Sequence, residues 1–270
     1  PDPAAMLAQV PPQPGAEAVA RTLEAARRES FVRLPRPEER MESLAFAVLV
    51  SIVWLTGCAH APRVRFTPED TPVPVLFVHG TDDNAGSFLP MIQAFEDAGW
   101  SRERLYAMSL YPQSGEVPIE AMAFQVGHAA QGLRKRTHAD QVDVVAFSQG
   151  ALSARYWLQF LGGHARVRRF ISISGPHQGT CLAWLRGNPA LEQMRPGSAF
   201  LRELNQAPQY GDTEVYSFWT PWDGIIVPSS SARLAGSHQR RFLVPFHFTM
   251  PADPAVIAAT VDVLASPQAR

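Results

Sequence analysis

The chain has 270 residues, a formal net charge of −1, 46% hydrophobic residues and 18% charged residues. This length and composition suit one globular domain with a non-globular end. The near-neutral balance of charges excludes the strongly basic surface that is typical of nucleic-acid binding.

The first 57 residues differ in composition from the remainder. Prolines punctuate an alanine-rich start, and arginines at positions 33, 36 and 40 precede an uncharged run over 43–57. The run is shorter than the ~20 apolar residues that span a bilayer, and it has the length of the hydrophobic region of a signal peptide. We therefore expect a non-globular leader over 1–57 and a proline-punctuated tether over 58–71. A buried apolar helix and an uncleaved signal anchor are the alternatives.

The uncharged run ends in Leu55-Thr56-Gly57-Cys58, which resembles the lipobox of bacterial lipoproteins. In that family the cysteine carries lipid and becomes the mature N-terminus. The resemblance implies that Cys58 is lipidated and that the protein is exported and anchored to a bacterial membrane, on the periplasmic side or the cell surface. Cys181 would then have no partner, although a disulfide between the two cysteines stays open.

From residue 72 onward, short apolar runs alternate with helical patterns. The apolar runs predict strands at Pro74–Val78, Arg104–Leu110, Val142–Phe147, Arg169–Ser174, Thr213–Phe218 and Arg240–Val244. The helical patterns predict helices at Ser87–Gly99, Pro118–Arg136, Leu152–Leu161 and Pro254–Ala265. This alternation implies right-handed βαβ units, which form a mostly parallel sheet of about six strands with helices on both faces.

Residues 175–212 interrupt the alternation, because they are too many for a simple connection. The segment contains the apolar run Cys181–Leu185 and a predicted helix at Ser198–Asn205. It follows the fourth strand, so it lies over the carboxyl edge of the sheet, where a lid over a functional site would be found. We expect a small, partly helical cap there.

The third predicted strand ends abruptly at Ser148, and a helical pattern follows. Ala146 and Gly150 stand two residues before and after the serine, so small side chains flank it on both sides. Such a sharp turn between strand and helix exposes a serine hydroxyl to a base and to oxyanion donors. The pattern predicts that Ser148 is a nucleophile, whereas the alternative is a serine that caps an ordinary helix.

These features together resemble the α/β-hydrolase fold, and within it the small bacterial lipases and esterases. The resemblance rests on the serine elbow, the His79-Gly80 turn and the chain order serine, acid, histidine, and it covers roughly residues 72–266. Too few residues precede Pro74 for the two strands that open larger members. We therefore expect the minimal, all-parallel version of the fold within a catalytic domain over 72–270.

The acid and the base can be chosen by their position along the strands. Catalytic groups of an open parallel sheet lie beyond the carboxyl ends of its strands. Asp223 follows the fifth strand and His247 follows the sixth, whereas Asp212 and His238 precede those strands. We therefore predict that His247 is the base and that Asp223 orients it. The alternatives are a turn residue for Asp223 and a packed loop residue for His247.

Two backbone N–H groups are expected to form the oxyanion hole. Gln149 directly follows the nucleophile, and the resemblance points to Thr81, which follows His79-Gly80. His79 resembles the structural histidine of the family. The residues expected near the substrate are Phe88, His177, Trp184 and Trp222.

The sequence contains no dinucleotide-binding glycine loop, P-loop or HExxH zinc motif, so we predict no cofactor and no metal. The predicted function is hydrolysis of carboxylic esters by a serine hydrolase, with lipid-like acyl esters as substrates. An amidase, a thioesterase or an acyltransferase with the same three residues is the alternative, as is a tethered binding protein of the same fold.

Overall fold

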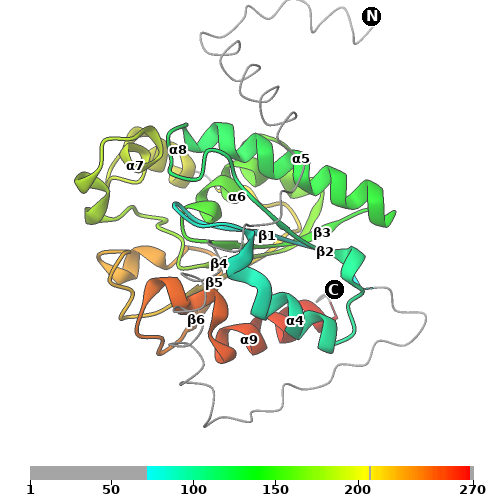
Figure 1. Cartoon of the computed structure of the whole chain (residues 1–270). Helices are drawn as coiled ribbons and strands as arrows, with labels where there is room; N and C mark the ends of the chain where they lie inside the picture. The colour runs from blue at the N-terminus through cyan, green and yellow to red at the C-terminus, as the bar shows by residue number, and fades with distance from the viewer. Residues whose placement is uncertain (1–71, 207, 268–270) are drawn as a thin grey trace, which may run out of the picture. The chain divides into compact units, whose positions relative to one another are not determined.

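A computed structural model of the chain describes residues 72–206 and 208–267 (Figure 1). The predicted leader over 1–57, the predicted tether over 58–71 and Cys58 lie outside these residues. Within the part that is described, no helix is both long enough and apolar enough to cross a membrane.

The described residues form one six-stranded sheet in the order β2-β1-β3-β4-β5-β6. Every neighbouring pair of strands is parallel, which confirms the predicted α/β fold with its all-parallel sheet. The strands are β1 (Val75–Val78), β2 (Leu105–Met108), β3 (Val142–Phe147), β4 (Val167–Ile173), β5 (Glu214–Trp219) and β6 (His238–Arg241). Because all six run the same way, their carboxyl ends meet at one edge of the sheet.

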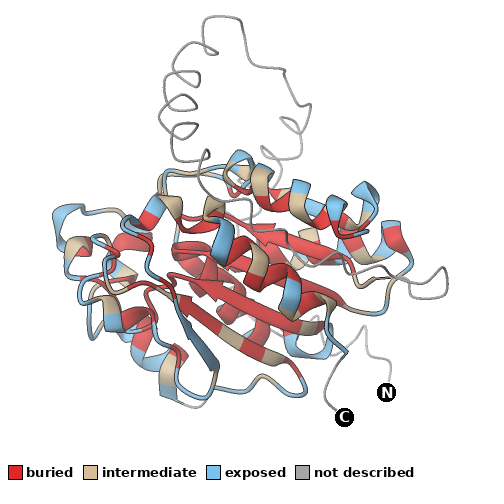
Figure 2. Ribbon diagram, turned by 90° about the horizontal axis from the view of Figure 1, so that it is seen from below, coloured by how far each residue is buried: buried red, intermediate tan, exposed pale blue. Residues whose placement is uncertain are grey.

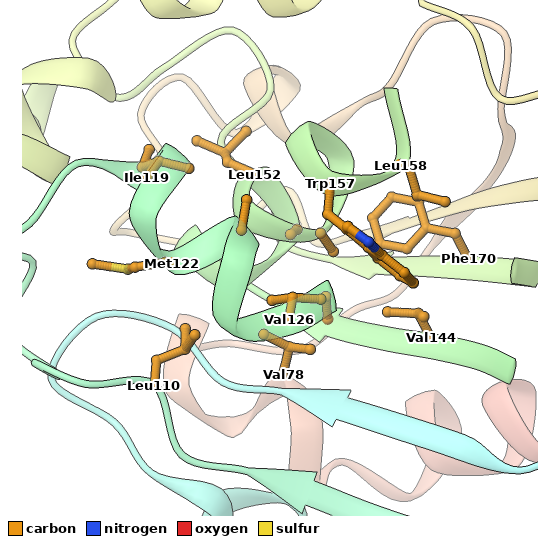
Figure 3. Close-up of a cluster of buried hydrophobic side chains, with 14 of the residues drawn as sticks. Val78, Leu110, Ile119, Met122, Val126, Val144, Leu152, Trp157, Leu158 and Phe170 are labelled. Atoms are coloured by element: carbon orange, nitrogen blue, oxygen red, sulfur yellow. The ribbon is translucent and has the colours of Figure 1, made fainter. Parts of the chain in front are cut away.

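Helices cover both faces of the sheet (Figure 1). Helices α5 (Ile119–Thr137) and α6 (Gln149–Phe160) pack on one face, where their apolar side chains form a core with the strands (Figure 3). Helices α4 (Leu89–Asp97) and α9 (Pro254–Ala265) pack on the other face, with a second apolar core. The sheet is therefore packed between two apolar layers. Polar functional groups are accordingly expected at the ends of its strands.

Local sequence explains where α9 begins. The Asp253 carboxylate accepts hydrogen bonds from the N–H groups of Ala255 and Val256, which have no partner further back in the helix. Pro254 occupies the first turn, where a missing N–H costs nothing. These two residues start the helix at the predicted position.

Strand β6 differs from its prediction, which placed it at Arg240–Val244. The strand is His238–Arg241, and all four of its residues are exposed at the edge of the sheet, whereas the central strands are buried (Figure 2). An edge strand needs no apolar side chains, because backbone hydrogen bonds to β5 hold it. The apolar Phe242 and Val244 come after the strand, and both are buried in the core with α4 and α9.

Charged residues fasten the amino edge of the sheet. Arg169 is 2% exposed and donates to Glu214 and to the carbonyls of Val263, Ser266 and Pro267. Arg168 also donates to the Leu264 carbonyl at 2.8 Å, so two guanidinium groups hold the end of α9, far from the carboxyl edge.

The cap segment over 175–212 is partly helical, as the sequence predicts, and it contains three short helical elements, including one over 189–193 that was not predicted. They are η5 (Cys181–Leu185), α7 (Pro189–Gln193) and α8 (Ala199–Gln206). Gln193 ties α7 to the start of α5, since its side chain accepts from Ile119 N–H at 2.6 Å and donates to Glu120 at 2.6 Å. The cap is thus anchored on the face of the sheet that α5 and α6 cover.

Candidate active site

Ser148 stands at the sharp turn between β3 and α6. Its backbone has φ 54° and ψ −129°, a conformation that L-residues rarely adopt. Gly150 is required beside it, because a Cβ there would lie 2.2 Å from the carbonyl oxygen of His79. Gly80 also lies close to the serine, since a Cβ at that position would lie 2.7 Å from Ser148 Cβ and 3.2 Å from Ser148 Oγ. The predicted elbow is therefore present, with β1's turn packed against the serine.

Hydrogen bonds join Ser148, His247 and Asp223 in one chain. His247 Nε2 lies 2.9 Å from Ser148 Oγ, and His247 Nδ1 lies 2.7 Å from Asp223 Oδ1. The histidine and the aspartate are each 2% exposed, whereas the serine keeps 9%. This geometry leaves Nε2 able to take the serine proton, while the carboxylate fixes the other ring nitrogen.

The loops after two neighbouring strands bring the acid and the base together. Asp223 follows β5, and His247 follows β6 in a short helical turn. The ring of Phe147, the last residue of β3, packs on the His247 ring at 4.7 Å between centroids. Asp212 precedes β5 and His238 begins β6, so both lie at the opposite edge of the sheet.

The turn after β1 lies beside the nucleophile. Thr81 follows Gly80, and its Oγ1 is buried and has no hydrogen-bond partner within the part of the chain that the structure describes. Asp82 has φ 56° and donates its N–H to the Gln113 carbonyl at 2.9 Å, and its carboxylate forms an ion pair with Arg186 of the cap. Gln149, the other predicted oxyanion donor, is the first residue of α6, so its N–H has no partner further back in the helix.

His79 is a buried, neutral histidine. Its Nδ1 donates to the Gly80 carbonyl and its Nε2 accepts from Leu110 N–H, both at 2.8 Å. Burial lowers the pKa of His79, although the Gly80 carbonyl partly offsets this. Both ring nitrogens are engaged, so His79 holds the turn after β1 in place.

His177 corrects one of the predictions, because it has no exposed surface with which to contact a substrate. Its Nδ1 accepts from Arg155 at 3.2 Å, and its Nε2 donates to Ser172 Oγ at 2.8 Å. Burial, reinforced by the Arg155 charge, holds the pKa of His177 well below its ordinary value. The side chain therefore forms part of the buried framework beneath the cap.

Phe88 is corrected in the same way. It is fully buried and packs on Phe77 at 5.3 Å between ring centroids. The two predicted tryptophans are placed differently, since Trp184 is 63% exposed on η5 and Trp222 is 56% exposed directly before Asp223. Only these two of the four predicted residues present a surface that a substrate can reach.

Sequence reasoning missed a buried arginine that connects α6 to the cap. Arg155 is fully buried and donates to Tyr210 Oη at 2.9 Å, to Asn205 Oδ1 at 3.0 Å and to the carbonyl of Leu204 at 3.2 Å. Asn205 in turn donates to the His177 carbonyl at 2.7 Å. The one sequence signal of Arg155 was its position as a charged residue within the otherwise apolar face of a helix.

The protonation of His177 predicts how stability depends on pH. The pKa of this histidine is lower in the folded protein, so at mildly acid pH the unfolded chain binds more protons than the folded one. The contribution of the neutral histidine to the free energy of unfolding is therefore complete above about pH 6.5 and is lost as the pH falls below it. We expect the free energy of unfolding to fall between pH 7.5 and 5.5, by up to about 1.4 kcal/mol per pH unit for each such histidine. In His177→Gln this slope should be flatter, as thermal and urea unfolding would measure.

His128→Gln serves as the matched control, because His128 is exposed on α5. It should keep the slope of the parent protein. Equal slopes in the parent and in His177→Gln would contradict a neutral His177.

The parallel sheet, the serine elbow and the hydrogen-bonded serine, histidine and aspartate define an α/β-hydrolase. A family model, lipase (class 2), matches residues 72–244. The chain therefore belongs to the class 2 lipase family, and it is a hydrolase of carboxylic esters.

Solved structures show the same fold. The mature lipase BlEst2 of Bacillus licheniformis is similar with a TM-score of 0.63 and 15% identity, over 73% of this chain and 94% of that chain. Lipase B of Aspergillus fumigatus is similar with a TM-score of 0.61 and 22% identity, over 77% of this chain and 56% of that chain. The metagenomic carboxyl esterase MGS0156 is similar with a TM-score of 0.59 and 14% identity, over 74% of this chain and 78% of that chain.

Proposed function

We propose that the protein cleaves lipid-like acyl esters through an acyl-enzyme on Ser148. The observation that supports this most is the continuous hydrogen-bonded chain from Ser148 Oγ through His247 to Asp223, at 2.9 and 2.7 Å. The 2.9 Å distance lies in the range over which a nucleophile passes its proton to a base, and the 2.7 Å hydrogen bond lets Asp223 hold the other ring nitrogen.

In the proposed reaction, Ser148 Oγ attacks the ester carbonyl and its proton passes to His247 Nε2. The N–H groups of Thr81 and Gln149 stabilise the negative oxygen of the tetrahedral intermediate. His247 then gives the proton to the leaving alcohol, and the acyl group stays on the serine. A water molecule, deprotonated by the same nitrogen, attacks the acyl carbonyl. The bond to Ser148 Oγ then breaks, His247 returns the proton to that oxygen, and the acid leaves. Asp223 stabilises the imidazolium in both halves.

Covalent labelling tests this assignment. A fluorophosphonate should label the protein once, and peptide mapping should place the label on Ser148, because only an activated hydroxyl attacks phosphorus at a useful rate. Denatured protein is the control. A folded, ester-hydrolysing protein that does not react, or that is labelled at another residue, would refute the assignment.

Exposed apolar side chains in the segments that follow the carboxyl ends of strands support a lipid-like substrate. Twelve large apolar side chains of the described residues are exposed, and nine of them follow the carboxyl ends of strands: Leu89, Tyr111, Trp184, Leu185, Trp222, Val227, Leu243, Phe246 and Phe248. Such concentrations on a soluble domain mark surfaces that contact apolar ligands. Phe246 and Phe248 flank the proposed base directly.

The η5 segment is expected to set the preference for chain length. Replacing both Trp184 and Leu185 with serine should weaken hydrolysis of dodecanoyl esters several-fold more than hydrolysis of butyryl esters, because each buried CH₂ contributes roughly 0.8 kcal/mol. A series of p-nitrophenyl esters measures this ratio. Phe124→Ser, on the exposed face of α5, is the control and should leave it unchanged. Equal losses on both esters would show that η5 does not bind the acyl chain.

We also propose that Cys58 carries lipid and that the enzyme works at a bacterial membrane outside the cytoplasm. This rests on the order of features in the sequence: arginines, a short uncharged run, then Leu55-Thr56-Gly57-Cys58. Several acyl chains on one cysteine would hold the protein firmly, whereas one chain anchors only marginally. Intact-mass analysis of the native membrane fraction should give a diacylated or triacylated chain that begins at Cys58. A Cys58→Ala protein that is still processed and membrane-bound would refute the proposal.

A further inference from the structure

The hydroxyl of Thr180 joins the start of η5 to the turn that follows the proposed triad acid. Thr180 is 5% exposed and directly precedes η5 at the base of the cap. Its Oγ1 donates to the Ile225 carbonyl at 2.5 Å and accepts from Val227 N–H at 3.0 Å and from Leu182 N–H at 3.3 Å. A hydroxyl has one donor and two acceptor positions, so all of its capacity is used here.

The turn that Thr180 holds is the turn that holds Asp223. Asp223 Oδ1 accepts from the N–H groups of Ile225 at 3.2 Å and Ile226 at 2.7 Å, in addition to His247. The other carboxylate oxygen is buried and has no hydrogen-bond partner among the described residues. Apart from the histidine, these two N–H groups are therefore what fixes the carboxylate.

Further hydrogen bonds join the base of the cap to the same loop. Cys181 N–H donates to the Val227 carbonyl at 2.9 Å, and Ser231 Oγ donates to the Gly179 carbonyl. Thr180 lies between these two contacts, and its side chain contacts both the cap helix η5 and the acid turn. Removing its hydroxyl would leave the backbone groups on both sides without a partner.

We infer that Thr180 is a positioning residue for ester hydrolysis, because its hydroxyl couples the cap to the turn that holds the Asp223 carboxylate against His247. This inference rests on the roles proposed above for Asp223 and His247. Thr180 touches neither the substrate nor the reacting atoms. It acts only through the position of Asp223.

The test compares Thr180→Val with Thr180→Ser. Valine has the shape of threonine without the hydroxyl, so kcat for p-nitrophenyl butyrate should fall by about 10²-fold with KM nearly unchanged, because a displaced catalytic group costs that much. Serine keeps the hydroxyl and should stay within about threefold of the parent. Circular dichroism gives the folded fraction of each variant, and rates are divided by the concentration of folded enzyme. If Thr180→Val does not fold, Thr180→Ala is assayed in its place with the same expectation.

Thr213→Val is the matched control. Thr213 is 7% exposed and its hydroxyl donates to the Val167 carbonyl at 2.8 Å, but it lies at the amino edge of the sheet. Its substitution should lower the melting temperature and leave kcat of the folded enzyme unchanged. Equal losses of kcat in Thr180→Val and Thr213→Val would mean that only general stability is affected, and the inference would fail.

A double-mutant cycle separates positioning from structural effects. On an Asp223→Ala background, Thr180→Val should lower kcat by about twofold or less, since the carboxylate that Thr180 positions is already absent. The same cost on both backgrounds would overturn the inference and leave the triad standing. A fully active Asp223→Ala protein would instead overturn the proposed triad itself, so the two failures are distinguishable.

Discussion

The Ser148→Ala protein should fold as its parent does and lose ester hydrolysis by on the order of 10⁴-fold or more. The alanine lacks only the hydroxyl that His247 Nε2 contacts at 2.9 Å, which is the group proposed to carry the acyl chain. Stability should change little, because the hydroxyl sits at the apex of the turn and makes no contact that supports the core. Steady-state rates on p-nitrophenyl butyrate, with thermal unfolding in parallel, measure both effects.

Ser153→Ala provides a matched control for this loss. Ser153 is a fully buried serine one turn further along α6, and its hydroxyl contacts the Gln149 side chain at 2.8 Å rather than the histidine. Its substitution should leave most of the activity. Near-normal turnover by a folded Ser148→Ala protein would remove the nucleophile from the proposal.

Asp223→Asn and His247→Ala should each reduce activity by on the order of 10⁴-fold. Asparagine would present an amide where the histidine needs an acceptor, so the ring would no longer be held with Nε2 toward the serine. The alanine removes the base outright. Measurements of kcat and KM at pH 8 would show a loss mainly in kcat, because substrate binding does not depend on either group.

Asp212→Asn and His238→Ala are the controls, because they make the same chemical changes at the opposite edge of the sheet. Both proteins should keep activity close to that of the parent. An inactive Asp212→Asn protein beside an active Asp223→Asn protein would reverse the assignment.

A helix or strand could be predicted from the sequence where one strong local signal defines its bounds. Strand β3 and helix α9 begin and end where the sequence places them, since an unbroken apolar run defines the first and Asp253-Pro254 starts the second. Strand β6 was misplaced because its residues are polar and exposed, and backbone pairing alone holds it. No hydrophobic pattern marks such an edge strand.

The chemistry of the candidate site was easier to anticipate than its surroundings. Strand-end position was enough to choose Asp223 and His247, which the fold brings to Ser148. Burial was not predictable to the same degree, so Phe88 and His177 were expected at the mouth and lie in the interior. Whether a side chain after a strand points outward or inward depends on contacts with distant segments, such as Arg155 on α6, and a local pattern carries no signal of them.

The backbone of Ser148 also affects how this chain can be evolved in the laboratory. Its φ of 54° and ψ of −129° suit glycine better than serine. A glycine there would relieve conformational strain while it deletes the hydroxyl, so variants selected for thermal stability alone gain by losing the chemistry. Libraries built for thermostability should therefore be sorted by turnover as well as by melting temperature, because the two criteria conflict at position 148.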